Sequence, residues 1–210
     1  MHLRKINLDH VPLWRYQQYM ATENPSEEDL LKCFLDLNSA EIKQLPFNQI
    51  DLYLDQITNL LQQDQPLTRV FKMGGIKYGF IPRLDDITYG ENADVTKYIV
   101  DYGSMHKAMA VLYRPIKQKI RDKYLIEDYE GSYQFADKMK YMPLSVALGA
   151  IVFFYNLTND LLNCIPKYLD KEMKNLDSTQ QAYFQKSGQG IQSSMRLVRE
   201  TLGDLIQSPK

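Results

Sequence analysis

Four acidic side chains lie close together in the sequence and suggest a site for a divalent cation. They are Asp85, Asp86, Glu91 and Asp94. Carboxylates are the usual ligands of Ca²⁺ and Mg²⁺, but this stretch lacks the alternating ligands and the mid-loop glycine of an EF-hand. We therefore interpret the four carboxylates as helix-capping and turn residues.

One histidine, His106, stands in a helical pattern between Met105 and Lys107. An imidazole at that place could act as an acid or a base near neutral pH. No carboxylate or cysteine at a fixed spacing supports such a role, so we predict that His106 packs or lies on the surface. A catalytic centre built from His106 and the acidic loop is the weakest of the functional hypotheses.

Two glycine-containing segments, Gly74-Gly75 and residues 188–190, lack the Lys and Ser/Thr of a phosphate-binding loop. We interpret both as turns. The sequence thus contains no recognisable nucleophile, metal or phosphate signature. We predict that the protein is not an enzyme and that it has no catalytic residue, no metal ligand and no cofactor.

The composition limits the class of protein. A chain of 210 residues with 44% hydrophobic content can bury one substantial core, and its net charge of −1 argues against coating nucleic acid. Cys33 and Cys164 lie far apart and lack metal-site spacing, which indicates a reducing compartment. The first residues show no signal-peptide pattern, and the apolar run from 146 to 155 is too short to span a bilayer. We expect neither export nor a membrane role.

The pattern predicts a mainly α fold with one small β-hairpin at about residues 69–81. Two β-prone runs flank Gly74-Gly75, and Pro82 ends the second run. Thr88 and Glu91 form a capping-box pattern that opens a helix, and another helix is expected from Ser104 until Pro115 bends or ends it.

Further helices are predicted on both sides of the hairpin. Asn24, Pro25 and Glu27 indicate a helix start, and apolar residues recur at helical spacing from Ile50 to Leu61. The run from 146 to 155 is the predicted central buried helix, continuing to Pro166, where it kinks or stops.

The C-terminal region changes character, so we predict a helical domain over 1–174 and a polar linker with an amphipathic helix over 175–210. Apolar residues recur there at spacings of four, three, four and three. They form a narrow seam suited to one partner helix, and this helix docks either on its own domain or on a neighbouring chain. The candidate protein-binding residues are Ile191, Met195, Val198, Leu202 and Leu205.

Charge is unevenly distributed along the chain. Residues 24–64 have a local balance of −6 and residues 104–123 a local balance of +5. Both stretches fit solvated helix faces that partly compensate each other, and a sharper hypothesis makes them a docking surface for another chain. The alternative function, nucleic-acid binding, would use Arg114, Lys117, Lys119, Arg121 and Lys123.

Three blocks of the sequence resemble a family of small helical proteins carried among the virion and tail genes of tailed bacteriophages. The resemblance covers roughly residues 1–165, and members of the family are often described as tail assembly chaperone-like. The residues that carry it are Tyr78 to Pro82, Leu84 to Thr88, Gly90-Glu91, Met105 to Ile116, Met142 to Leu144, Ala147 to Gly149 and Phe153 to Leu157.

This resemblance implies a phage structural or assembly protein that works by protein–protein binding. The implied partners are other phage virion or tail proteins, with a homo-oligomer left open. The implied location is the host cell cytoplasm during assembly, with retention in the virion left open. The 15 tyrosines and nine methionines fit this expectation, because both residue types are enriched at the cores of interfaces. Net charge disfavours nucleic acid as the partner.

Overall fold

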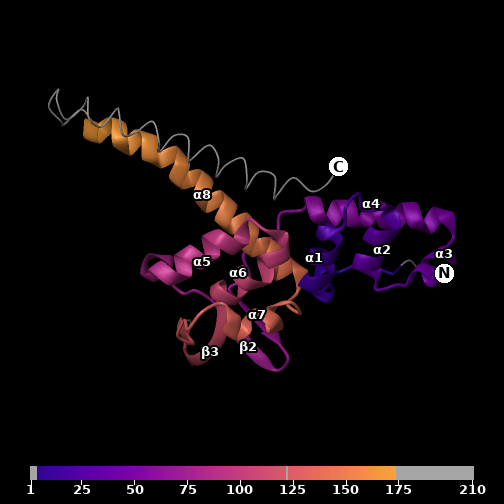
Figure 1. Cartoon of the computed structure of the whole chain (residues 1–210), viewed down its shortest axis with the longest axis horizontal. Helices are drawn as coiled ribbons and strands as arrows, with labels where there is room; N and C mark the ends of the chain where they lie inside the picture. Colours follow the sequence, from indigo (N-terminus) through magenta and orange to yellow (C-terminus); the bar gives the residue numbers. More distant parts are fainter. Residues whose placement is uncertain (1–3, 122, 174–210) are drawn as a thin grey trace. The chain divides into compact units, whose positions relative to one another are not determined.

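The computed structural model describes residues 4–121 and 123–173. The chain divides into two compact units, Met1–Ala150 and Ile151–Lys210. Figure 1 shows the helices and strands of the first unit and the helix α8, whose first turns belong to that unit. The predicted boundary between residues 174 and 175 stays a prediction, because the residues beyond it lie outside the described part.

The described residues form α-helices, three short 3-10 helices and one sheet. The α-helices are α1 (Leu13–Ala21), α2 (Glu27–Leu35), α3 (Ser39–Lys43), α4 (Phe47–Gln62), α5 (Tyr89–Ile99), α6 (Met105–Leu112), α7 (Tyr133–Met139) and α8 (Leu144–Met173). The 3-10 helices are η1 (Leu8–His10), η2 (Leu84–Asp86) and η3 (Tyr102–Ser104). The strands are β1 (Val70–Met73), β2 (Ile76–Phe80), β3 (Tyr113–Ile120) and β4 (Lys123–Ile126).

The four strands form one antiparallel sheet in the order β1-β2-β3-β4. The hairpin predicted for residues 69–81 is present as β1 and β2, with Gly74 and Gly75 both at positive φ. The prediction that this hairpin stands alone in a mainly α fold is wrong, because β3 pairs with β2 and carries β4 on its other side. The fold is therefore mixed α/β.

The missed hairpin, β3–β4, lacks the usual signals of a turn. Arg121, directly after β3, adopts a φ of +53°, a conformation that glycine and asparagine adopt far more readily than arginine. Pro115 stands within β3 opposite Tyr78, although proline is normally confined to edge strands. A bulge between Ile116 and Gln118 follows at once. The helix predicted to extend to Pro115 ends at Leu112, the last residue of α6.

Contacts with β2 explain why the chain forms a hairpin here despite its weak local signals. A Cβ atom added to Gly79 would lie 2.5 Å from Cε2 of Tyr124 and 3.0 Å from Cγ2 of Ile126. The hydroxyl of Tyr124 donates a hydrogen bond to the carbonyl of Phe80 at 2.8 Å. β4 thus packs across β2, and this long-range packing outweighs local preference.

The core of the first unit combines aromatic side chains from the sheet with methionine and leucine side chains from the helices. Phe71 stacks on Tyr78 with 5.4 Å between ring centroids, and Tyr113 meets Phe80 edge to face at 5.3 Å. The largest fully buried side chains outside the sheet are those of Leu13, Leu31, Ile57, Met105, Met109, Leu112, Met139, Met142 and Leu144. At least four of the nine methionines therefore serve to fill the core of this unit.

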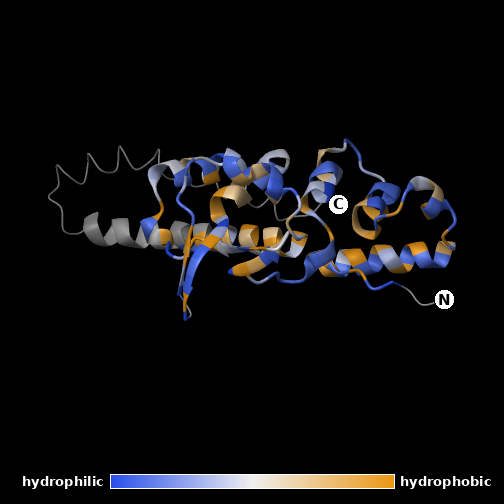
Figure 2. Ribbon diagram, turned by 90° about the horizontal axis from the view of Figure 1, so that it is seen from below, coloured by the Kyte–Doolittle hydropathy of each residue, from blue (hydrophilic) through white to orange (hydrophobic). Residues whose placement is uncertain are grey.

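Of two predicted helix starts, one is confirmed and the other lies two residues later in the chain. Thr88 and Glu91 form the capping box of α5, as predicted. The helix expected at Asn24 begins two residues later, with Ser26 and Asp29 as its capping box. In α4, polar and apolar residues alternate around the helix (Figure 2), and Ile57 from the predicted stripe is fully buried.

The predicted central helix is the beginning of α8. Its residues Leu144, Val146, Ala147 and Ala150 are buried in the first unit, whereas Val152 to Tyr155, in the second unit, are only half-buried. The core segment thus lies earlier in the chain than the apolar run indicated. Pro166 does not end the helix, since α8 continues to Met173.

Candidate functional site

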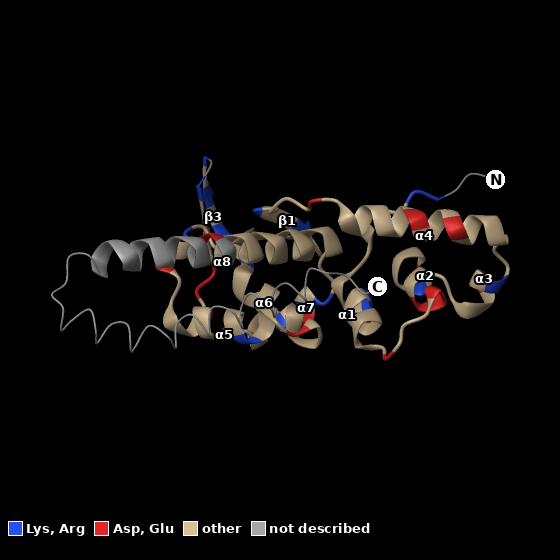
Figure 3. Cartoon of the chain, turned by 90° about the horizontal axis from the view of Figure 1, so that it is seen from above, with Lys and Arg blue, Asp and Glu red and all other residues tan. Residues whose placement is uncertain are grey.

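The clearest exposed feature of the first unit is a cationic hairpin. It consists of residues 117–121 and 123–125, from β3, the residue after it and β4, and we name it the basic ribbon. Figure 3 shows it projecting from the sheet, with Lys and Arg along the strands. Lys117, Lys119, Arg121 and Lys123 are all exposed there.

The pairing register divides the side chains of the basic ribbon between two faces. Gln118 pairs with Leu125 and Ile120 with Lys123, so these four side chains share one face. Ile120 is 59% exposed and Leu125 60%. Two large apolar side chains therefore stand in solvent beside a lysine, on a surface that nothing in the described part of the chain covers.

The charges of the basic ribbon are mostly unmatched. Lys117 pairs with Asp128 at 2.7 Å, and this hydrogen-bonded pair raises the pKa of Lys117 and lowers that of Asp128. Lys119, Arg121 and Lys123 form no ion pair with any described residue. Three cations are thus available to an acidic partner.

Arg114, the first residue of the predicted nucleic-acid set, is not part of this surface. Its side chain is 7% exposed, and its Nη2 donates to Oε1 of Glu91 at 2.5 Å. Oε2 of the same carboxylate accepts from the backbone N–H of Thr88 at 2.7 Å. The guanidinium lies 5.7 Å from the ring centroid of Tyr129. Arg114 therefore ties the sheet to the start of α5 rather than meeting solvent.

No family model, curated protein or solved structure matches this chain. The phage resemblance accordingly remains an expectation. Within residues 4–121 and 123–173, no helix combines the length and apolarity that crossing a membrane requires.

Three of the four acidic residues near α5 have separate partners. Asp86 pairs with Arg83 at 3.1 Å, Glu91 with Arg114, and Asp94 accepts a hydrogen bond from the hydroxyl of Tyr129. Burial and this bond to Asp94 raise the pKa of Tyr129. The described residues contain no group of three or more His, Cys, Asp and Glu side chains that could hold a metal ion.

His106 is buried against α1. Its Nδ1 lies 3.0 Å from Nε2 of Gln17, and the same amide donates to the carbonyls of Tyr102 at 2.6 Å and Gly103 at 3.1 Å. Burial, aided by the positive charge of Lys140, lowers the pKa of His106. The imidazole is thus a neutral packing group that helps to join α1 to η3 and α6.

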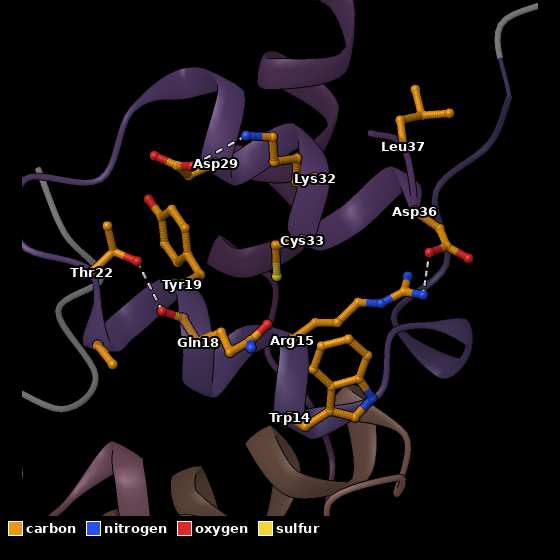
Figure 4. A pocket seen from close by; sticks show the side chains of 11 residues that line it. Trp14, Arg15, Gln18, Tyr19, Thr22, Asp29, Lys32, Cys33, Asp36 and Leu37 are labelled. Atoms are coloured by element: carbon orange, nitrogen blue, oxygen red, sulfur yellow. Dashed lines mark hydrogen bonds and ion pairs between the residues drawn. The ribbon is translucent and has the colours of Figure 1, made fainter. Parts of the chain in front are cut away.

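A groove between α1 and α2 encloses about 570 Å³. Its residues are drawn in Figure 4, and we name it the α1–α2 groove. Arg15 on α1 pairs with Asp36, and Lys32 lies 3.7 Å from Asp29 on α2. Cys33 lies at the centre of the view, and burial raises the pKa of its thiol to about 12. A thiol with so little thiolate at neutral pH is a poor nucleophile.

A second cavity, of about 640 Å³, lies where β4 folds over β2. We name it the ribbon pocket. Its lining residues are Arg69, Ile81, Pro82, Arg83, Asp86, Glu91, Arg114, Lys123, Tyr124, Leu125 and Ile126.

The sequence analysis missed the apolar half of the basic ribbon and the whole ribbon pocket. The available signal was the mixture of Ile116, Ile120, Leu125 and Ile126 with lysines, which is typical of strands that are partly exposed to solvent. The candidate seam, Ile191, Met195, Val198, Leu202 and Leu205, lies outside the described residues, and its role stays a prediction.

Proposed function

We propose that this chain is a phage structural or assembly protein that binds a protein of the tail or virion. The basic ribbon contacts an acidic, partly apolar surface of that partner. The observation that carries the proposal is the exposure of Ile120 and Leu125 on a projecting hairpin that also bears three unpaired cations. Large apolar side chains in such a position mark a surface that another protein covers.

Nucleic acid is the second candidate, because a two-stranded β-ribbon fits the major groove and its cations neutralise phosphates. Lys119, Arg121 and Lys123 favour it. Ile120 and Leu125 favour protein instead, since an apolar side chain gains little from a phosphate backbone. The net charge of −1 and the buried pairing of Arg114 also reduce the cationic surface.

The phage setting of this proposal rests on the sequence resemblance described above. The C-terminal seam would supply a second binding element, either for another copy of the chain or for the same partner. The enzyme hypothesis gains no argument from His106 and the acidic residues near α5, because His106 is buried against Gln17, while Asp86, Glu91 and Asp94 each have a partner of their own.

A capture experiment with matched variants tests the proposal. The bait is the full chain, the source is a lysate of phage-infected cells, and the partner is identified by mass spectrometry. The variant Lys119→Glu/Arg121→Glu reverses the ribbon charge, and Lys72→Glu/Lys77→Glu makes the same change on the cross-strand pair of the β1–β2 hairpin. We expect the first variant to lose the partner and the second to keep it.

A third variant, Ile120→Ser/Leu125→Ser, separates the two candidates without changing charge. If a protein is bound, this variant loses it. If nucleic acid is bound, the variant still shifts DNA in a gel while Lys119→Glu/Arg121→Glu does not. Retention of the protein partner by both ribbon variants, with each variant still folded, would contradict the proposal.

A further inference from the structure

The ribbon pocket differs from the α1–α2 groove in its unmatched positive charge. Four cationic side chains line it, and two carboxylates accompany them. Arg83 pairs with Asp86 and Arg114 with Glu91. Arg69 and Lys123 form no ion pair with any described residue, so the lining keeps two free positive charges.

These two cations come from distant parts of the sequence. Arg69 precedes β1, and Lys123 begins β4. They share one cavity because Tyr124 brings β4 across the sheet, with its hydroxyl 2.8 Å from the carbonyl of Phe80 and 3.3 Å from that of Arg69. Arg69 and Lys123 therefore lie together because of the fold, and not because they belong to one run of charges in the sequence.

One residue that lines the pocket, Arg114, has a buried donor without an acceptor. Arg114 is only 6% exposed, and its Nε is buried. This Nε has no hydrogen-bond partner in the described part of the chain. A buried N–H left unpaired is costly. A small movement of the guanidinium toward an anion in the pocket would give this donor an acceptor.

The remaining walls are apolar. Ile81, Pro82, Leu125 and Ile126 line the same cavity as the two free cations. Its volume lies within the range of roughly 300 to 1,000 Å³ that is usual for small-molecule sites. A ligand that suits such walls has an anionic end and an apolar body.

We propose that the ribbon pocket binds a small organic anion, a phosphate or carboxylate attached to an apolar group. Arg69 and Lys123 hold the anion, and Ile81, Pro82, Leu125 and Ile126 contact the apolar part. This proposal goes beyond the protein-binding function and does not depend on it. Lys119 and Arg121, whose charge reversal tests that function, do not line the pocket, whereas Lys123 and Leu125 belong to both surfaces.

Isothermal titration calorimetry of the full chain in low-salt buffer tests the pocket. The probes are phenyl phosphate, benzoate and inorganic phosphate. We expect saturable binding of one phenyl phosphate per chain, and weaker binding of inorganic phosphate because it lacks an apolar body. Benzoate carries a carboxylate and phenyl phosphate carries a phosphate on the same apolar ring. The probe that binds more tightly therefore identifies which of the two anionic groups the pocket prefers.

Single variants assign the binding to the pocket. Arg69→Gln and Lys123→Gln should each weaken the preferred probe by about tenfold, the loss expected when a charged hydrogen-bond donor is removed. Lys72→Gln is the matched control, because Lys72 is an exposed lysine of β1 that does not line the cavity. It should leave the affinity unchanged.

Two results would overturn the proposal. One is the absence of saturable binding by every probe, with dissociation constants weaker than about 10 mM. The other is equal weakening by Lys72→Gln and by the two pocket variants, which would show attraction to diffuse surface charge. Circular dichroism of each variant checks that the fold is retained, so that loss of binding is not loss of structure.

Discussion

The α1–α2 groove and the ribbon pocket have similar volumes, about 570 and 640 Å³, and opposite charge arrangements. In the groove each cation meets a carboxylate, Arg15 with Asp36 and Lys32 with Glu28 and Asp29. In the ribbon pocket Arg69 and Lys123 have no such partner. By volume, the two cavities are equal candidates for a ligand site. The unpaired cations make the ribbon pocket the better candidate for an anionic ligand.

The two cavities show that the charges left unpaired by folding distinguish a binding surface from a structural one. Ion pairs that close within the chain stabilise the fold and leave nothing for a ligand. Cations that remain unmatched after folding repel one another slightly and are available to an anion. The basic ribbon and the ribbon pocket both belong to the second kind.

The largest expected effect contrasts the buried ion pair of the ribbon pocket with the exposed pair of the groove. Glu91→Gln should lower the free energy of unfolding by about 3 to 5 kcal/mol, because it leaves the charge of Arg114 buried and uncompensated. Asp36→Asn should cost less than about 1 kcal/mol, since Asp36 is 67% exposed. Urea denaturation measures both, and equal losses would break the comparison.

The second largest effect on stability is expected at Gly79, where β4 packs against β2 beside the ribbon pocket. Gly79→Ala should cost about 1 to 3 kcal/mol, because the new methyl group would overlap the ring of Tyr124. Gly90→Ala in α5 is the control, where the nearest atom lies at an ordinary 3.6 Å and alanine favours a helix. Thermal melts of the two variants should therefore move in different directions, and a neutral Gly79→Ala would mean that β4 does not pack there.

Part of this arrangement could be predicted from the sequence. The β1–β2 hairpin and the capping box at Thr88 rest on local signals, a glycine pair and a fixed spacing, and both are present. β3 and β4 were missed because Pro115 and Arg121 are poor local indicators of a strand and a turn. Their placement depends on the contact of Tyr124 with Gly79, forty-five residues earlier in the chain, which no local pattern contains.

The candidate site follows the same division. Lys117, Lys119, Arg121 and Lys123 were chosen from the sequence as a basic run, and they are exposed. Arg114 was placed with them although it is buried against Glu91, because sequence spacing cannot show which cation a distant carboxylate neutralises. Arg69 could not be chosen at all, since only the fold brings it to the same cavity as Lys123.

A smaller effect concerns the other side of α1, where Gln17 meets His106. The pKa of His106 is lowered in the folded state, so the unfolded chain binds more protons as the pH falls. Stability should therefore decrease from pH 7 to pH 5, by at most about 1.4 kcal/mol per pH unit from this group.

His106→Asn should flatten that dependence, because asparagine keeps an acceptor for Gln17 but does not titrate. His10→Asn is the control at an exposed histidine and should leave the dependence as it is. Urea titrations at several pH values provide the measurement. An unchanged slope in His106→Asn would show that folding does not lower the pKa of the imidazole.

The central claim is that unmatched cations beside exposed apolar side chains make the basic ribbon a binding surface for protein. An amide chemical-shift titration with a peptide of alternating Glu and Leu residues tests it directly. The account predicts shifts at residues 119–121 and 123–125, none in the α1–α2 groove, and their loss in Lys119→Glu/Arg121→Glu. Equal shifts at Lys72 and Lys77, or shifts centred on the groove, would contradict it.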